Sequence, residues 1–93
     1  MNKFIRNHLF IFGKVQGVAF RYYAQKIASK LELTGWIKNC NDGKVEIVIE
    51  GITEKVNKFN DWCYTGSRSA RVEKVVIYQE KFIGEFHYFN IHG

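Results

Sequence analysis

The stretch from Leu9 to Leu31 joins a strand pattern to a helix pattern through a loop that contains glycine, and it constrains the fold more than any other part of the chain. Leu9 and Ile11 belong to an alternating run that predicts a strand from about Phe4 to Gly13. Helical spacing of apolar residues then predicts a helix from about Phe20 to Leu31, with an inward face made of Phe20, Tyr23, Ala24, Ile27, Ala28 and Leu31. A strand that passes through such a loop into a helix leaves backbone N–H groups unpaired at the helix start, which is a ready site for an anion.

Arg21 adds a cation to this predicted anion site. It falls in the first turn of the predicted helix, where a guanidinium can donate two parallel hydrogen bonds to a phosphate or a carboxylate. The sequence therefore predicts an anion-binding loop between Gly13 and Phe20 that is supplemented by the Arg21 side chain.

The rest of the chain alternates strand and helix patterns separated by turn residues. Asn41, Asp42 and Gly43 supply a hairpin turn, since asparagine and glycine accept positive φ. Thr53 is the predicted N-cap of a second helix that buries Val56, Phe59 and either Trp62 or Cys63. The elements predicted after the first helix are a strand at Thr34 to Asn39, a strand at Lys44 to Glu50, the helix that follows Thr53, a loop at Gly66 to Ala70, and strands at Arg71 to Glu80 and Phe86 to Ile91.

This order of elements predicts an α+β fold. It fits a ferredoxin-like βαββαβ sandwich with a terminal strand, in which two helices pack on one face of an antiparallel sheet of four to five strands, and residues 1–93 form a single domain. A right-handed crossover makes the first two strands parallel, with the third strand between them. Their C-terminal ends then share one edge of the sheet, so Asn39 is expected beside the anion-binding loop although it follows Arg21 by 18 residues.

Composition narrows the range of partners. The formal charge of +5 favours anionic partners, and the basic residues are spread along the chain rather than grouped in one block. No apolar run reaches 18 residues, and the first residues lack the apolar stretch of a signal peptide, so we expect a cytoplasmic protein with no membrane partner. Cys40 and Cys63 match no metal-ligand spacing and are expected to be free thiols in that compartment.

Three short motifs resemble those of the acylphosphatase family. The segment Gly13-Lys14-Val15-Gln16-Gly17-Val18-Ala19-Phe20-Arg21 is similar to the family's Gly-x-Val-Gln-Gly-Val-x-Phe-Arg signature. Gly35-Trp36-Ile37-Lys38-Asn39 and the Asp42-Gly43 hairpin match two further motifs in the right order. The resemblance extends over the whole chain. One departure is Gly66-Ser67, where the family often has Gly-Pro, and we expect it to affect only a loop away from the site.

The resemblance implies a hydrolase that cleaves acyl phosphates to a carboxylate and inorganic phosphate. It implies action on a small molecule, with no cofactor and no metal. A monomer is expected separately, because the domain is small and charged and has no heptad pattern. Arg21 and Asn39 are the catalytic residues under this interpretation: Arg21 binds the phosphoryl oxygens and Asn39 orients the attacking water. Phosphate is also bound by the backbone N–H groups of the loop residues Val15, Gln16, Gly17, Val18, Ala19 and Phe20, and Tyr22 is a candidate for the pocket rim.

Other functions that suit this fold or chemistry fit the sequence less well. An RNA-recognition domain needs an aromatic-rich third strand, but residues 44–50 contain no aromatic and two glutamates, so no nucleic-acid partner is expected. Neither the Cys-x5-Arg motif of cysteine phosphatases nor a P-loop motif is present. The alternative that stays open is a regulatory or phosphate-binding ferredoxin-like domain without turnover, because a fold does not prove an activity.

Overall fold

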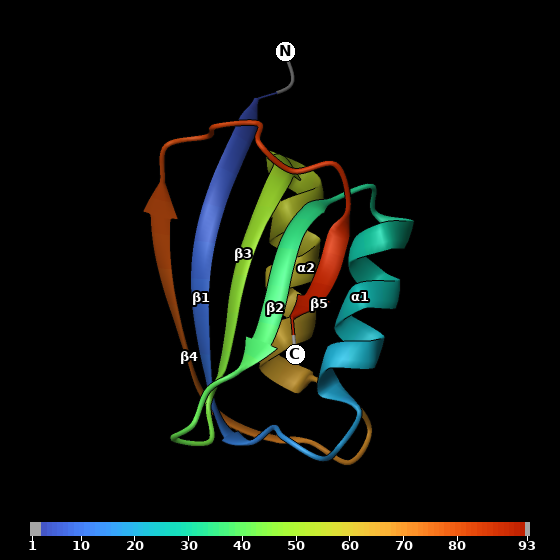
Figure 1. Ribbon diagram of the computed structural model, residues 1–93, viewed down its shortest axis with the longest axis vertical. Coiled ribbons are helices and arrows are strands. Elements are labelled where there is room, and N and C mark those ends of the chain that lie inside the picture. The colour runs from blue at the N-terminus through green and yellow to red at the C-terminus, as the bar shows by residue number, and fades with distance from the viewer. Residues whose placement is uncertain (1–2, 93) are drawn as a thin grey trace.

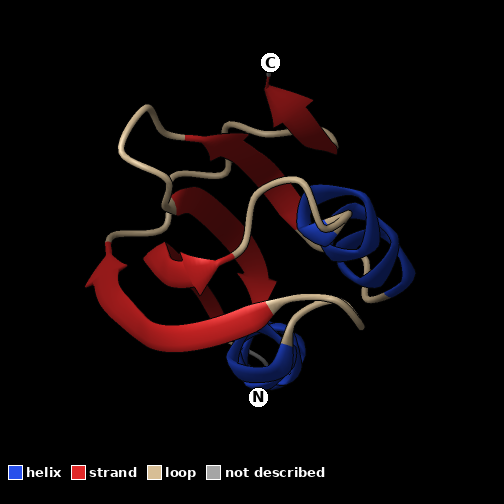
Figure 2. Ribbon diagram, turned by 90° about the horizontal axis from the view of Figure 1, so that it is seen from below, coloured by secondary structure: helices blue, strands red, loops and turns tan. Residues whose placement is uncertain are grey.

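Five strands form one sheet, and two helices cover one of its faces, in the computed structural model, which describes residues 3–92 (Figures 1 and 2). The α+β ferredoxin-like arrangement expected from the sequence is confirmed. The elements are β1 (Phe4–Lys14), α1 (Phe20–Lys30), β2 (Thr34–Asn39), β3 (Val45–Ile52), α2 (Thr53–Thr65), β4 (Arg71–Glu80) and β5 (Phe89–His92).

The order of strands across the sheet is β4-β1-β3-β2-β5 (Figure 1). β3 lies antiparallel between β1 and β2, so β1 and β2 run in the same direction, as predicted. The sheet is mixed rather than wholly antiparallel, because β5 pairs with β2 in parallel. The chain leaves β4 at the far edge and crosses the end of the sheet before it enters β5, which explains the parallel direction and why β5 begins at Phe89 instead of Phe86.

The core lies between the sheet and the two helices. Alternate residues of β1 and β3 point toward the helices and are fully buried, among them Leu9, Ile11 and Ile47. On α1 the buried positions are Phe20, Ala24 and Ala28, spaced four residues apart. The prediction that Tyr23 is buried is wrong: Tyr23 is 46% exposed, because it falls beside the stripe of Phe20, Ala24 and Ala28 that packs into the core.

The second helix starts without the predicted cap. Thr53 is already helical, and Ile52 holds the N-cap position with extended backbone angles and no side-chain bond. The Thr53 hydroxyl instead donates a hydrogen bond to the carbonyl of Lys3 at 2.9 Å. β3 therefore runs directly into α2, and Thr53 ties this junction to the start of β1.

A buried carboxylate holds the connection that leads to β5. Glu50 is 1% exposed and lies on the face of the sheet opposite the helices. It accepts hydrogen bonds from the backbone N–H groups of Ile83 (2.9 Å) and Gly84 (3.1 Å), and its third partner is the Arg6 guanidinium at 3.3 Å. Arg6 also bonds Glu80, and this hydrogen bond, followed by one from His8, lowers the pKa of the Glu80 carboxyl. This network fixes the path of the chain before it enters the edge strand.

Gly35 at the start of β2 is a position where any side chain would collide with the sheet. Its φ is +141°, and a Cβ there would lie 1.9 Å from the carbonyl oxygen of Val48. We expect Gly35→Ala to lower the free energy of unfolding by about 3 kcal/mol in urea denaturation, from backbone strain and crowding together. Gly43 is the matched control, because its φ is also positive at +97° but no heavy atom lies within 4 Å of the place that its Cβ would take. Gly43→Ala should cost only about 1–2 kcal/mol, and equal losses at both positions would contradict the crowding argument.

Neither helix in the described part of the chain is long and apolar enough to cross a membrane.

Candidate functional site

The loop between β1 and α1 starts from an irregularity in the sheet. The register of β1 against β4 shifts between Phe12 and Gly13, which marks a bulge at the end of β1. Gly13 has a φ of +127°, and a Cβ on it would lie 2.2 Å from the carbonyl oxygen of Arg71. Only glycine lets the two strands approach this closely while the chain turns away toward the helix.

The loop itself contains two residues with left-handed backbone. Gly17 has a φ of +71°, and Ala19, at the N-cap of α1, has a φ of 61° and a ψ of 22°. For a residue with a Cβ this conformation is strained, and such strain gathers at functional sites. Ala19 has no side-chain hydrogen bond that caps the helix. The first backbone N–H groups of α1 are therefore left uncapped in a concave turn, which is a geometry that binds anions.

A cavity of about 210 Å³ opens at this loop and brings the two predicted catalytic residues together. In Figure 1 the loop after β1 and the end of β2 lie at the same end of the sheet. The residues that line the cavity are Val15, Gly17, Ala19, Phe20, Arg21, Tyr22, Asn39 and Ile91. Arg21 and Asn39 thus share one cavity although they come from different elements, as the expected crossover topology requires.

Gln16 and Val18, also predicted for the anion-binding loop, are not among the residues that line this cavity. The Gln16 amide donates hydrogen bonds to the carbonyls of Cys40 (2.8 Å) and Lys44 (3.0 Å). These bonds tie the loop to the β2–β3 hairpin directly after Asn39. Gln16 therefore fixes the distance between the loop and the strand end that carries Asn39.

The expectation that Ser67 lies away from the site is wrong. Its side chain is 6% exposed, and its hydroxyl donates a 2.6 Å hydrogen bond to the carbonyl of Val18 in the anion-binding loop. A proline at this position has no donor to make that bond. Ser67 thus anchors the loop. It belongs to the segment that follows α2, which is distant from the loop in the sequence.

The positive charge of Arg21 has no acidic partner within the first turn of α1. Arg21 occupies that turn, where the helix dipole is positive, and α1 has no acidic residue there. The guanidinium donates a 3.3 Å hydrogen bond to the carbonyl of His92. A cation at the positive end of a helix is unfavourable by itself, so the arrangement gains from a bound anion.

Asn39 presents a buried acceptor without a partner. It is the last residue of β2 and pairs with Val45 in the register of the sheet. Its side-chain oxygen Oδ1 is buried and has no hydrogen-bond partner among the described residues. A buried carbonyl oxygen normally has a donor, so Oδ1 of Asn39 is an acceptor left unpaired among the described residues.

Cys40 follows Asn39 but is not poised to react. It is a free thiol, as predicted, and partly buried. Burial, and then the nearby Glu46 carboxylate, raise the pKa of the Cys40 thiol above its usual value. The reactive thiolate form of Cys40 is therefore disfavoured.

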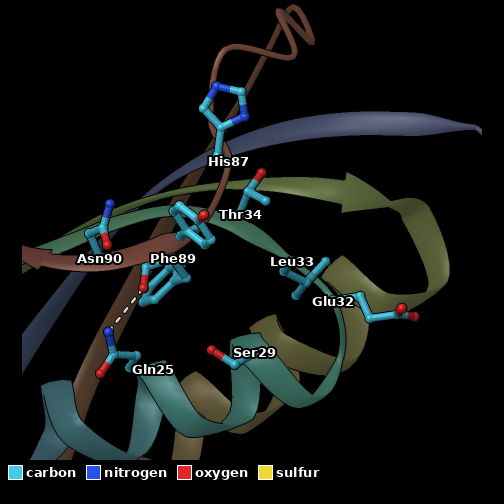
Figure 3. Close-up of a pocket in the computed structure, with 9 residues that line it drawn as sticks. Gln25, Ser29, Glu32, Leu33, Thr34, His87, Phe89 and Asn90 are labelled. Carbon is cyan, nitrogen blue, oxygen red and sulfur yellow. Dashed lines mark hydrogen bonds between the residues drawn. The ribbon is translucent and has the colours of Figure 1, made fainter.

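A second, larger cavity of about 540 Å³ lies along the other half of α1 and beside β5 (Figure 3). Figure 3 shows Gln25 and Ser29 of α1 on one side of it and Thr34 and His87 on the other. Gln25 donates a 3.0 Å hydrogen bond to the carbonyl of Phe89, which holds β5 against α1. The lining of this larger cavity contains Glu32 and, in the described part of the chain, no lysine or arginine, so the cavity does not suit a phosphate. The smaller cavity is the candidate site because it combines a cation with unpaired donors.

Within residues 3–92 no three His, Cys, Asp or Glu side chains gather closely enough to form a metal site. Two residues of the small cavity lie outside the motifs that predict the site. Tyr22 is identifiable only as the neighbour of Arg21, and Ile91 reaches the cavity because β5 pairs with β2, a long-range contact with no local signal.

Comparison with known proteins identifies the family. The family model for acylphosphatase matches residues 7–91. The chain is 46% identical over 86 residues to an acylphosphatase of Syntrophobacter fumaroxidans, covering 92% of this chain and 89% of that protein. It is 42% identical over 87 residues to an acylphosphatase of Chloroflexus aurantiacus, covering 94% and 95%. The crystal structure of acylphosphatase from Bacillus subtilis superposes with a TM-score of 0.92 at 34% identity, covering 96% of this chain and 99% of that one. The chain therefore belongs to the acylphosphatase family.

Proposed function

We propose that this protein hydrolyses acyl phosphates, the mixed anhydrides of a carboxylic acid and phosphoric acid. The observation that carries the proposal is the shared cavity of Arg21 and Asn39, at the uncapped start of α1. Membership of the acylphosphatase family supports the same reaction.

The phosphoryl group would be held by the loop and by Arg21. Phosphoryl transfer asks a protein for positioning and for stabilisation of charge on the phosphoryl oxygens. We assign these oxygens to the backbone N–H groups of residues 15–20 and to the Arg21 guanidinium. The absence of an acidic residue in the first turn of α1 leaves this positive region free for a phosphate.

Asn39 would orient the attacking water. Its unpaired Oδ1 can accept a hydrogen bond from that water and direct the water's lone pair at phosphorus. An amide does not titrate near neutral pH, so the proton of the water passes to an oxygen of the substrate. The new bond forms between the water oxygen and phosphorus, the bond from phosphorus to the acyl oxygen breaks, and the carboxylate leaves with the electron pair.

We propose that this reaction needs no metal ion. A hard cation such as Mg²⁺ is bound through carboxylates, and in the described chain the lining of the small cavity includes no Asp, Glu or His. Arg21 and the loop N–H groups would supply the charge stabilisation that a metal provides in other phosphoryl-transfer enzymes.

The test is hydrolysis of benzoyl phosphate by the purified protein, with and without excess chelator. We expect release of benzoate and inorganic phosphate at the same rate in both conditions. Loss of turnover with chelator would refute metal independence. Binding of phosphate without any turnover would refute the hydrolase proposal and favour the alternative, a phosphate-binding or regulatory domain.

We also propose that the protein acts as a monomer in the cytoplasm, without a nucleic-acid or membrane partner. Two free thiols, Cys40 and Cys63, suit a reducing compartment. On the face of β3 that points away from the helices, Glu46 and the buried Glu50 stand in place of the aromatic side chains on which bases stack.

A further inference from the structure

We propose that Tyr22 and Ile91 form a binding subsite for the acyl group, one that favours uncharged aromatic acyl groups over acetyl. This inference rests on the proposed function, because it concerns the part of the same substrate that leaves as a carboxylate. It is carried by the composition of the small cavity and by the way in which these two side chains are held.

The apolar residues of the cavity fall into two kinds. Val15 and Phe20 are each 1% exposed, so their side chains belong to the core. Tyr22 and Ile91 are 53% and 37% exposed, so they keep apolar surface that a substrate can cover. Burying such surface against an apolar group is favourable in rough proportion to the area removed from water.

The Tyr22 ring packs against two other side chains of α1. It makes an edge-to-face contact with Tyr23, with ring centroids 5.0 Å apart and planes at 78°. The Lys26 ammonium lies 5.3 Å from the ring centroid and 3.5 Å from the phenol oxygen. A ring that already has contacts on two sides loses less conformational entropy when it stacks on a ligand than a ring without them.

Ile91 is held by the sheet. It pairs with Ile37 in the parallel register of β2 and β5, two residues before Asn39. Phe89, two residues before Ile91, is buried at 4% exposure. The carbonyl of His92, the next residue, accepts the hydrogen bond from Arg21. The position of Ile91 is therefore coupled to both ends of the candidate site, Arg21 on one side and the end of β2 on the other.

The chemistry of the lining defines the acyl group. Arg21 is the only charged side chain among the described residues that line the cavity, and the phosphoryl group would occupy it. Within the described lining, the subsite thus offers no second cation to a charge on the acyl part, and the nearby Lys26 ammonium lies over the Tyr22 ring, outside the lining. A volume of about 210 Å³ is below the ~300–1000 Å³ of pockets for drug-sized ligands, so the cavity suits a small acyl group such as a single ring.

The experiment compares two stable analogues in which a methylene replaces the bridging oxygen: phenacylphosphonate for benzoyl phosphate and acetonylphosphonate for acetyl phosphate. Calorimetric titration should show phenacylphosphonate binding roughly tenfold more tightly to the parent protein, the scale of apolar discrimination in a pocket. Tyr22→Ala and Ile91→Thr should each remove most of that ratio while the affinity for acetonylphosphonate changes less than about threefold. Tyr22→Phe, which keeps the ring, should retain the ratio.

Tyr64→Ala is the matched control, because Tyr64 is an equally exposed tyrosine (56%) on α2 and does not line this cavity. A ratio that is the same in the parent, Tyr22→Ala and Ile91→Thr would overturn the subsite. The ratio of kcat/KM for benzoyl and acetyl phosphate should follow the binding ratio. If the analogues are discriminated but neither acyl phosphate is hydrolysed, the proposed function fails and the subsite stands; if both are hydrolysed without discrimination, the subsite fails and the proposed function stands.

Discussion

Replacing Arg21 with glutamine is expected to lower kcat/KM for benzoyl phosphate by ~10³-fold or more, because it removes the one charged side chain that lines the small cavity among the residues described. Glutamine keeps a donor and much of the length but loses the positive charge. Competitive inhibition by inorganic phosphate should weaken together with turnover, by roughly 10–100-fold, since the guanidinium binds the phosphoryl oxygens in the ground state as well.

The same substitution should leave the free energy of unfolding unchanged or slightly higher. The Arg21 side chain makes one long hydrogen bond, 3.3 Å to the His92 carbonyl, and lies at the positive end of the α1 dipole. Removing a cation from that end is favourable by about 0.3–1 kcal/mol. A variant that loses activity and also unfolds in much less urea would mean that Arg21 is structural. Arg68→Gln is the control, because Arg68 is exposed and does not line the small cavity; its activity should match the parent.

Replacing Asn39 with alanine is expected to separate turnover from phosphate binding. Turnover should fall by ~10²–10³-fold, the usual effect of removing one preorganised polar group from a transition state. The inhibition constant of phosphate should change less than about threefold, because Asn39 is assigned to the water and the loop holds the phosphate. Steady-state kinetics with phosphate as inhibitor measures both quantities in one experiment.

Two outcomes would contradict this role of Asn39. An equal loss of phosphate affinity would mean that Asn39 shapes the anion-binding loop. A large loss of stability would mean that its amide supports the end of β2, whereas an unpartnered Oδ1 predicts little or no loss. Asn57→Ala on the exposed side of α2 is the control for a simple amide deletion.

Arg21 and Ser67 show the two extremes of what the sequence could predict about the site. The placement of Arg21 at the small cavity follows from its position one residue after a loop that contains Gly13 and Gly17, so the local pattern is enough to predict it. Ser67 contacts Val18 only because the segment after α2 packs against the anion-binding loop. The sequence-based interpretation places Ser67 away from the site. A contact between segments 49 residues apart has no period or spacing that reveals it.

The helix boundaries show the same division. The stripe of Phe20, Ala24 and Ala28 is evident from helical spacing and is buried as predicted. The same local rules give a wrong result for Tyr23, because it falls beside the stripe that packs into the core, and for Thr53, because β3 continues to Ile52. Tertiary packing overrides a local preference that is worth about 1 kcal/mol.

The sequence alone determined the order of strands and helices along the chain, the loop that precedes α1, and the placement of Arg21 and Asn39 at the same cavity. These follow from periodicity, from glycine at turns and from the handedness of a crossover, all of which are properties of a short stretch of chain or of chirality. Only the tertiary structure decided that β5 lies parallel to β2, that Ile91 reaches the cavity beside Tyr22, and that Oδ1 of Asn39 is buried without a partner among the residues described. Those features depend on which distant surfaces pack together, and the energy of such contacts is set by shape and burial across the whole molecule rather than by any one segment.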